Sequence, residues 1–318
     1  MKRLISLAVS TLILIIIYTQ IDVAGLIAVF RDCNLGWMAI SLGMVVPITF
    51  FSSWRLQQVV PPQVTLGLWE AHKLILAASV LNMVLPSKMG DIAKAYFMRD
   101  RSNISGSLAL SIVVFEKACD FLSLLLWCGV GLILFPVKDT FFVSMSIVVT
   151  VGFFSGVLIL GSRSVAKLFF GLLQRIAPKK ISGKLRQLET SWQEMQDYIW
   201  RDRSQLLIVA TTSIFIWLLH LLQIWFFILA LNAWVAPITN LALSPLAILA
   251  GLLPLTFAGV GTRDAALIFL YQPYLGSAAA AALGLLCTSR YLLPAIGGLP
   301  FLNQYLSRLN QSRSQSHS

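Results

Sequence analysis

Six charged residues lie inside or at the edge of apolar stretches long enough to cross a membrane, and their side chains can bind ions or carry protons. These residues are Glu116, Lys117, Asp120, Arg263, Asp264 and Arg290. On insertion scales, one charge at the bilayer centre costs ~2.5–3.5 kcal/mol, so these six cannot all face lipid. Because three are positive and three are negative, the sequence predicts a neutral polar network inside a helical bundle.

The types of these side chains indicate two kinds of chemistry. Glu116 and Asp120 are four residues apart on a predicted helix over 107–135, so their carboxylates share one face and are candidate proton carriers. The cations Arg263, Lys117 and Arg290 are suited to neutralise an anionic group. The alternative is that the network only holds helices together, although buried ion pairs stabilise less than apolar packing does.

Two broken-helix motifs are expected to position these charges. The first is Leu-Pro-Ser-Lys-Met-Gly-Asp over 85–91, and the second is Leu-Pro-Leu-Thr-Phe-Ala-Gly-Val-Gly-Thr-Arg-Asp over 253–264. Proline and glycine interrupt backbone hydrogen bonding, which a lipid-facing segment does not tolerate. Paired broken helices in the two halves of a membrane protein point to a substrate site. The alternative is a pair of ordinary spans with proline kinks.

An aspartate opens the helix after each break. Helix starts at Asp91 and Asp264 would present free backbone N–H groups and positive dipole ends to an anion. Alternatively, each aspartate only caps its own helix.

The composition identifies an all-α, polytopic membrane helix bundle. Hydrophobic residues make up 58% of the chain and charged residues only 12%, against about a quarter in an average soluble domain. Since ~20 apolar residues cross the hydrocarbon core, we expect six full crossings. These lie near 4–21, 35–54, 107–135, 141–161, 205–231 and 278–302.

The distribution of basic residues predicts the orientation of the bundle. Nine of the 24 Lys and Arg lie between Arg163 and Arg203, and we also count Arg55 and Lys73 as cytoplasmic. Cytoplasmic loops collect Lys and Arg, which places both termini inside. The net charge of +11 therefore reflects contact with an anionic leaflet, most simply that of the plasma membrane, and not nucleic acid.

With this orientation, the two motifs become re-entrant hairpins of opposite direction. Segments 71–87 and 90–100 would enter from the cytoplasm, and 241–257 and 263–275 from outside. Three crossings separate the hairpins, so they would form an inverted repeat whose tips meet near the bilayer midplane. The expected organisation is one membrane domain over 1–306, with halves 1–135 and 141–306, a cytoplasmic amphipathic elbow over 162–204, and a disordered tail over 307–318.

The sequence shows no sign of a metal, cofactor or catalytic motif. The four cysteines have no ligand spacing, and there is no nucleotide-binding loop or nucleophile elbow. We therefore expect no metal and no cofactor, and favour a transporter over an enzyme. The predicted headgroup-binding residues are Asn82, Lys88, Asp91, Lys94, Lys117, Arg263, Asp264 and Arg290, and the predicted proton carriers are Glu116 and Asp120.

Three signatures resemble the lysylphosphatidylglycerol synthase transmembrane region, also called the flippase-like domain. The 85–91 motif followed by Lys-Ala-Tyr at 94–96 is similar to the first signature of that family. Phe-Glu-Lys-Ala-Cys-Asp over 115–120, with Ser107 and Ala109, is similar to its Glu-Arg-x-x-Asp signature, and 259–266 is similar to Gly-x-Gly-x-Arg-Glu-Ala. Lys117 replaces the usual Arg and cannot make its planar two-point contact, while Asp91 and Asp264 replace Glu.

The resemblance implies a lipid translocase that is not driven by ATP. In the multiple peptide resistance factor type, such a region flips a phospholipid that a separate soluble domain has aminoacylated, and we expect this chain to be the membrane part alone. The implied substrate is an anionic or modified phospholipid, a glycolipid or a polyprenyl lipid. The alternatives are a non-transporting membrane partner of a lipid or glycan synthase, and a membrane-embedded transferase acting on a lipid-linked substrate. A separate synthase or glycosyltransferase is the expected protein partner, and a homo-oligomer stays open.

Overall fold

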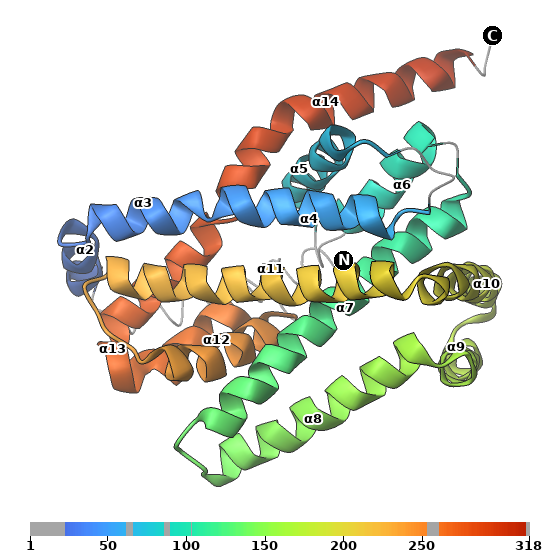
Figure 1. Ribbon diagram of the computed structural model, residues 1–318. Coiled ribbons are helices and arrows are strands. Elements are labelled where there is room, and N and C mark those ends of the chain that lie inside the picture. Colours follow the sequence, from blue (N-terminus) through green and yellow to red (C-terminus); the bar gives the residue numbers. More distant parts are fainter. Residues whose placement is uncertain (1–22, 62–65, 86–89, 103, 253–260, 316–318) are drawn as a thin grey trace.

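Helices account for almost all of the chain that the structure describes, which is residues 23–61, 66–85, 90–102, 104–252 and 261–315 of a computed structural model (Figure 1). No strand occurs in these residues, so the predicted all-α fold is confirmed. The helices are α2 Val23–Arg31, α3 Leu35–Gly43, α4 Val45–Val59, α5 Leu68–Val84, α6 Gly90–Ser102, α7 Gly106–Leu134, α8 Thr140–Gly161, α9 Arg163–Ile176, α10 Lys179–Arg201, α11 Arg203–Ala230, α12 Pro237–Leu252, α13 Thr262–Ser289 and α14 Leu292–Gln315.

Five helical segments are long and apolar enough to cross a membrane. They are Leu35–Val59 (α3 with α4), Gly106–Leu134, Thr140–Gly161, Arg203–Ala230 and Thr262–Ser307 (α13 with α14). These segments contain or closely match the crossings expected from the sequence, except the one at 4–21, which lies outside the described residues. The arrangement is that of a polytopic membrane helix bundle. In Figure 1, α3 and α4 lie end to end, α11 runs beside both of them, and α7 crosses the bundle obliquely.

The crossing predicted over 278–302 lies within the apolar segment Thr262–Ser307, which consists of two helices joined by a turn. Helix α13 ends at Ser289, Arg290 and Tyr291 form a turn, and α14 begins at Leu292. Pro294 gives the physical reason, because a proline lacks the N–H donor and its ring clashes with the carbonyl four residues earlier, here that of Arg290. A second interruption lies at Gly276, whose positive φ of 73° separates the two parts of α13 near the predicted boundary at 275–278.

The two predicted hairpins are present as pairs of packed helices. Helix α5 has 17 residues and α12 has 16, so each is only about 24–26 Å long and shorter than a ~30 Å hydrocarbon core. In the first pair, a side chain at Gly90 would collide with the backbone of α5 at Ala78 and Asn82. In the second, a side chain at Gly251 would collide with Arg263 of α13. The backbones within each hairpin therefore pack closely.

Two apolar clusters lie at opposite ends of α7 and leave a polar layer between them. The first half of α7, from Ala109 to Cys119, packs with α4, α5, α6 and α10. The second half, from Leu124 to Leu132, packs with α11, α12 and α13. Glu116 and Asp120 of α7 face the region where the two clusters meet, which places the polar side chains in the middle of the bundle.

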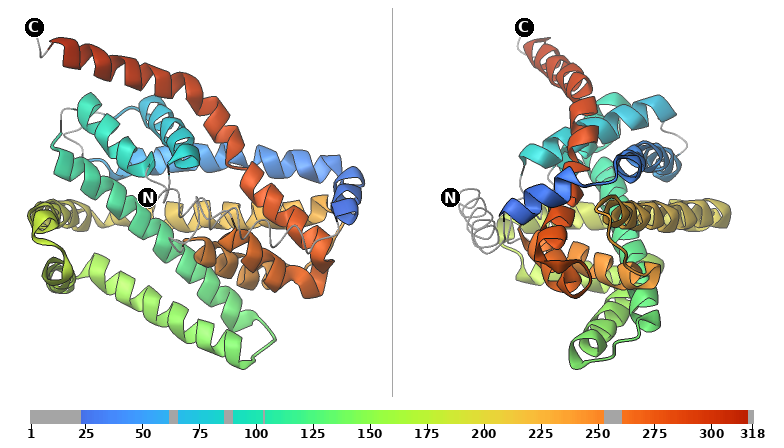
Figure 2. Two further views of the ribbon diagram at one scale, coloured as in Figure 1. Left: turned by 180° about the vertical axis from the view of Figure 1, so that it is seen from behind. Right: turned by 90° about the vertical axis from the view of Figure 1, so that its left-hand side faces the viewer.

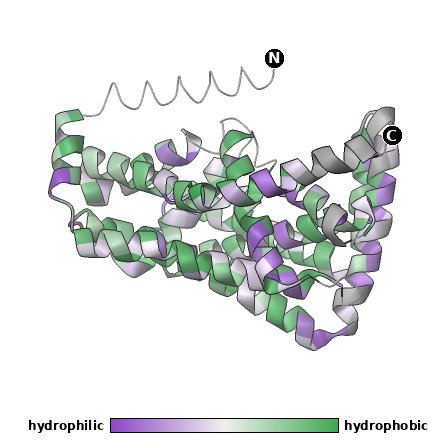
Figure 3. Cartoon of the chain, turned by 90° about the horizontal axis from the view of Figure 1, so that it is seen from above, coloured by the Kyte–Doolittle hydropathy of each residue, from purple (hydrophilic) through white to green (hydrophobic). Residues whose placement is uncertain are grey.

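The elbow consists of α9 and α10, seen at one end of the molecule in Figure 2. Helix α9 exposes apolar side chains such as Leu168 and Ile176, while it buries Phe170. Helix α10 buries Trp192 against Phe115 of α7, with ring centroids 5.9 Å apart. Figure 3 shows apolar residues over much of the bundle and hydrophilic residues concentrated towards this end, as expected for a helix pair at a membrane surface.

The crossing of α14 over α5 gives a first prediction. A Cβ at Gly298 would collide with the backbone carbonyl of Leu76 and the side chain of Val80, whereas a Cβ at the adjacent Gly297 meets nothing within 4 Å. Gly298→Ala should therefore destabilise the protein by about 1–3 kcal/mol, and Gly297→Ala should not. Thermal unfolding of the detergent-purified variants measures the difference, and equal unfolding temperatures would contradict this packing.

Candidate functional site

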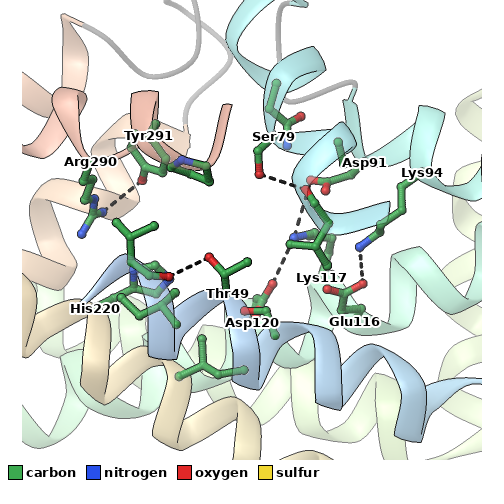
Figure 4. A pocket seen from close by; sticks show the side chains of 18 of the residues that line it. Thr49, Ser79, Asp91, Lys94, Glu116, Lys117, Asp120, His220, Arg290 and Tyr291 are labelled. Atoms are coloured by element: carbon green, nitrogen blue, oxygen red, sulfur yellow. Dashed lines mark hydrogen bonds and ion pairs between the residues drawn. The ribbon is translucent and has the colours of Figure 1, made fainter. Parts of the chain in front are cut away.

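A cavity of about 280 Å³ lies between α4, α5, α6, α7, α11 and the α13–α14 junction (Figure 4). Its size is close to the lower end of small-molecule pockets, which span ~300–1,000 Å³. One part of the lining is apolar and includes Ile48, Ile75 and Trp217. The polar and charged lining residues are Thr49, Ser52, Arg55, Ser79, Asn82, Asp91, Lys94, Glu116, Lys117, Asp120, His220, Gln223, Thr288, Arg290 and Tyr291.

Arg55 is the centre of the ion pairs on one side of the cavity. Its guanidinium donates to Asp120 Oδ1 at 2.6 Å and to Glu116 Oε1 at 3.1 Å. It also donates to Ser213 Oγ at 3.0 Å. The second oxygen of Glu116 accepts from Lys94 Nζ at 2.5 Å. Because the side chains of Arg55, Lys94 and Glu116 are each at most 2% exposed, these charges depend on one another for compensation.

Lys117 extends the same network towards the open part of the cavity. Its ammonium lies 3.2 Å from Asp120 Oδ2 and 3.5 Å from Asp91 Oδ2, and its side chain is 44% exposed. The resulting set of Arg55, Lys94 and Lys117 with three carboxylates has no net charge. A neutral internal network was predicted, but its membership differs, because Arg55, Asp91 and Lys94 take the places expected for Arg263, Asp264 and Arg290.

The assignment of Arg55 to a cytoplasmic loop is wrong. Helix α4 continues to Val59, so Arg55 lies inside the helix, with only 2% of its surface exposed. The apolar stretch ends at Trp54, and a count of charge-free residues therefore put Arg55 outside the membrane. A usable signal was present: Leu56, Val59 and Val60 continue the apolar helical spacing up to Pro61.

Arg290 lies across the cavity from this network, at the turn between α13 and α14. Its guanidinium donates to Gln223 Oε1 at 3.4 Å and to the Tyr291 hydroxyl at 3.0 Å, and lies 5.0 Å from the centre of the Tyr291 ring. The residue is 4% exposed, and its Nε atom has no hydrogen-bond partner in the parts of the chain that the structure describes. Among the described residues, no carboxylate forms an ion pair with Arg290.

Arg263 and Asp264 form a separate pair that does not line the cavity. Arg263 donates to Asp264 Oδ1 at 2.8 Å and to Thr288 Oγ1 at 2.5 Å. The other oxygen of Asp264 accepts from Gly261 N at 3.1 Å and thereby caps α13, which is the alternative role considered for this residue. Contact of these two side chains with a headgroup stays a prediction.

The remaining predicted site residues divide into two groups. Asn82 lines the cavity from α5, and its buried Oδ1 has no hydrogen-bond partner among the described residues. Lys88 lies outside the described residues. His220 and Gln223, which were not among the predicted site residues, also line the cavity. No group of His, Cys, Asp and Glu that could hold a metal ion occurs in the described part of the chain.

Long apolar helices around a charged interior cavity define the class of this molecule: it is a polytopic integral membrane protein. Its family follows from the sequence model of the lysylphosphatidylglycerol synthase TM region, which matches residues 3–298. The chain belongs to this family, as its three signatures indicated. No curated protein sequence matches the chain.

The ion network gives a second prediction. Arg55→Met would leave Glu116 and Asp120 short of a buried counter-ion, which costs about 3–5 kcal/mol. The matched change Lys117→Met removes a side chain that is 44% exposed, and exposed pairs contribute at most about 1 kcal/mol. Thermal unfolding in detergent should therefore show a much larger loss for Arg55→Met. Equal losses would mean that Arg55 is not the centre of the network.

Proposed function

We propose that this protein is a lipid translocase, in which a polar headgroup crosses the bilayer through the cavity while the acyl or isoprenyl tails stay in the membrane. The observation that carries the proposal is a cavity with charged lining inside an apolar bundle. The first helix pair, α5 with α6, lines this cavity, and α5, like α12 of the second pair, is shorter than the hydrocarbon core. Membership of a family named for a lipid synthase's membrane region supports a function concerned with membrane lipids.

The cavity lining suits an amphipathic molecule. Arg55, Lys117 and Arg290 lie on its polar sides, while Ile75 and Trp217 provide apolar surface. Charged residues within membrane spans are costly and usually mark a substrate or ion pathway. A headgroup in this cavity would meet hydrogen-bond donors on two opposite sides. A network that only holds helices together would not need donors on both sides.

The two hairpins are the proposed moving parts. We propose that α5 with α6 enters from the cytoplasmic side and that α12 with the first part of α13 enters from outside, as an inverted repeat with both termini inside. The short lengths of α5 and α12 and the glycine contact within each hairpin support this arrangement. Rocking one repeat against the other would expose the cavity to each leaflet in turn.

Ion coupling offers a driving force without ATP, with Glu116 or Asp120 as the proton carrier. Each carboxylate pairs with two cations, so protonation of either one would give the neutral network one net positive charge. The added positive charge would strengthen the binding of an anionic headgroup in the cavity. Proton binding and headgroup binding would thus favour each other. We expect the plasma membrane as the location and a separate synthase or glycosyltransferase as the source of the lipid.

A reconstituted liposome assay tests the transport. Purified protein should move a fluorescent phospholipid between leaflets, measured by chemical quenching of the outer leaflet. Ser79→Trp places a large ring in the cavity and should slow this movement at least about tenfold, a barrier of ~1.4 kcal/mol. Ser144→Trp is the matched control, because Ser144 is exposed on α8, away from the cavity.

Both variants should unfold at temperatures near that of the unmodified protein, which separates transport from folding. Equal movement by both variants, or none by the unmodified protein, would contradict the proposal. The second result would favour the alternative role as a non-transporting partner of a synthase.

A further inference from the structure

We infer that the cavity selects a lipid headgroup with one net negative charge, a phosphodiester, and that Arg290 is its anion-binding residue. This inference rests on the proposed function only in taking a lipid as the occupant. It depends on a difference between the two sides of the cavity: the charged side chains on one side form ion pairs, and Arg290 on the other side does not pair with a described carboxylate.

The charges that line the cavity do not balance. Four described lining residues are cationic (Arg55, Lys94, Lys117 and Arg290) and three are anionic (Asp91, Glu116 and Asp120). With His220 neutral, the described part of the lining therefore has one net positive charge. Six of the seven form the neutral network, so the excess charge belongs to Arg290.

Arg290 is placed to bind an anion and not to complete a structural pair. It is 4% exposed, and within the described part of the chain its hydrogen-bond partners are the neutral groups of Gln223 and Tyr291. A buried cation without a counter-ion is costly, and binding one anion would remove that cost. The planar guanidinium is also the side-chain group best matched to phosphate oxygens. Its unpaired Nε adds a donor that a phosphate oxygen can use.

The opposite side of the cavity offers little to a cationic headgroup. Glu116 and Asp120 each accept from two protein cations, and Asp91 lies 3.5 Å from Lys117. A headgroup amine would have to displace one of these cations, whereas a hydroxyl or sugar could accept from Lys117 without disturbing a pair. A zwitterionic or aminoacylated lipid is therefore disfavoured, and an anionic lipid with a neutral polar headgroup is favoured.

The single excess charge also favours a phosphodiester over a phosphate monoester. A monoester carries about −1.5 to −2 at neutral pH, which exceeds what Arg290 compensates, and a phosphodiester carries one negative charge. Two lipid classes have this chemistry: glycerophospholipids such as phosphatidylglycerol, and polyprenyl lipids joined to a sugar through one phosphate.

A lipid-binding experiment with purified protein tests the inference. The probes are phosphatidylglycerol, phosphatidylcholine, lysylphosphatidylglycerol and a polyprenyl phosphate sugar, each titrated against the protein in neutral detergent. The unmodified protein should bind an anionic phosphodiester lipid about 10- to 100-fold more tightly than the zwitterionic and cationic lipids, the range expected for a charge-assisted hydrogen-bonded contact. Tighter binding of phosphatidylglycerol or of the polyprenyl lipid identifies the source.

Two pairs of variants isolate the charge of Arg290. Arg290→Gln should lose the preference, while Arg290→Lys should keep part of it. Gln223→Glu would give Arg290 a counter-ion inside the protein and should also lose the preference, although Arg290 is still present. Gln223→Met, which adds no charge, should keep it. Unfolding temperatures of all four variants check that the comparison is made between folded proteins.

Equal binding of all four lipids by the unmodified protein would overturn the inference, as would an unchanged preference in Arg290→Gln and Gln223→Glu. The outcome is separate from that of the transport assay. Selective binding without movement between leaflets would remove the proposed function and leave this inference standing. Movement of phosphatidylcholine and phosphatidylglycerol between leaflets at equal rates would support the proposed function and overturn this inference.

Discussion

Compensation of charge inside an apolar bundle is the constraint on which the rest of this structure depends. The guanidinium of Arg55 is held by Glu116 and Asp120, and Lys94 completes the pairing of Glu116. Four helices are tied together through these contacts, because Arg55 lies on α4, Lys94 on α6, the two carboxylates on α7, and Ser213, which also accepts from Arg55, on α11. The polar layer between the two apolar clusters is thus both a structural junction and the wall of a cavity.

Interruptions of the helices also lie at this polar layer. Helix α5 ends beside the cavity at Val84, and the turn between α13 and α14 puts Arg290 beside the cavity instead of within a continuous helix. Pro294 makes that turn favourable, since it removes a helical hydrogen bond that would otherwise join the two helices. Non-helical backbone at membrane depth is tolerated only where it is buried in protein or lines a polar cavity. The helix breaks and the charged side chains therefore need the same kind of interior location.

The helices and the region of the site could be predicted from the sequence, whereas the pairing within the site could not. Apolar length predicted α7, α8 and α11, and the two Leu-Pro breaks predicted the hairpins that contain α5 and α12. Hydropathy cannot tell which charges meet, because partners such as Arg55 and Asp120 are 65 residues apart. The sequence placed Arg55 outside the helix because it directly follows the charge-free stretch. Arg263 and Asp264 form an ion pair with each other, and their spacing in the sequence does not distinguish such a pair from a contact with substrate.

We propose that the cavity holds a lipid headgroup whose single negative charge is compensated by Arg290. Mass spectrometry of the lipids that remain bound to protein purified in mild detergent tests this most directly, with Arg290→Gln as the comparison. We predict that the unmodified protein retains a phosphodiester lipid of one net negative charge, enriched well above its share of the membrane, and that Arg290→Gln does not. Bound lipids with the bulk composition of the membrane, in both proteins alike, would contradict the account.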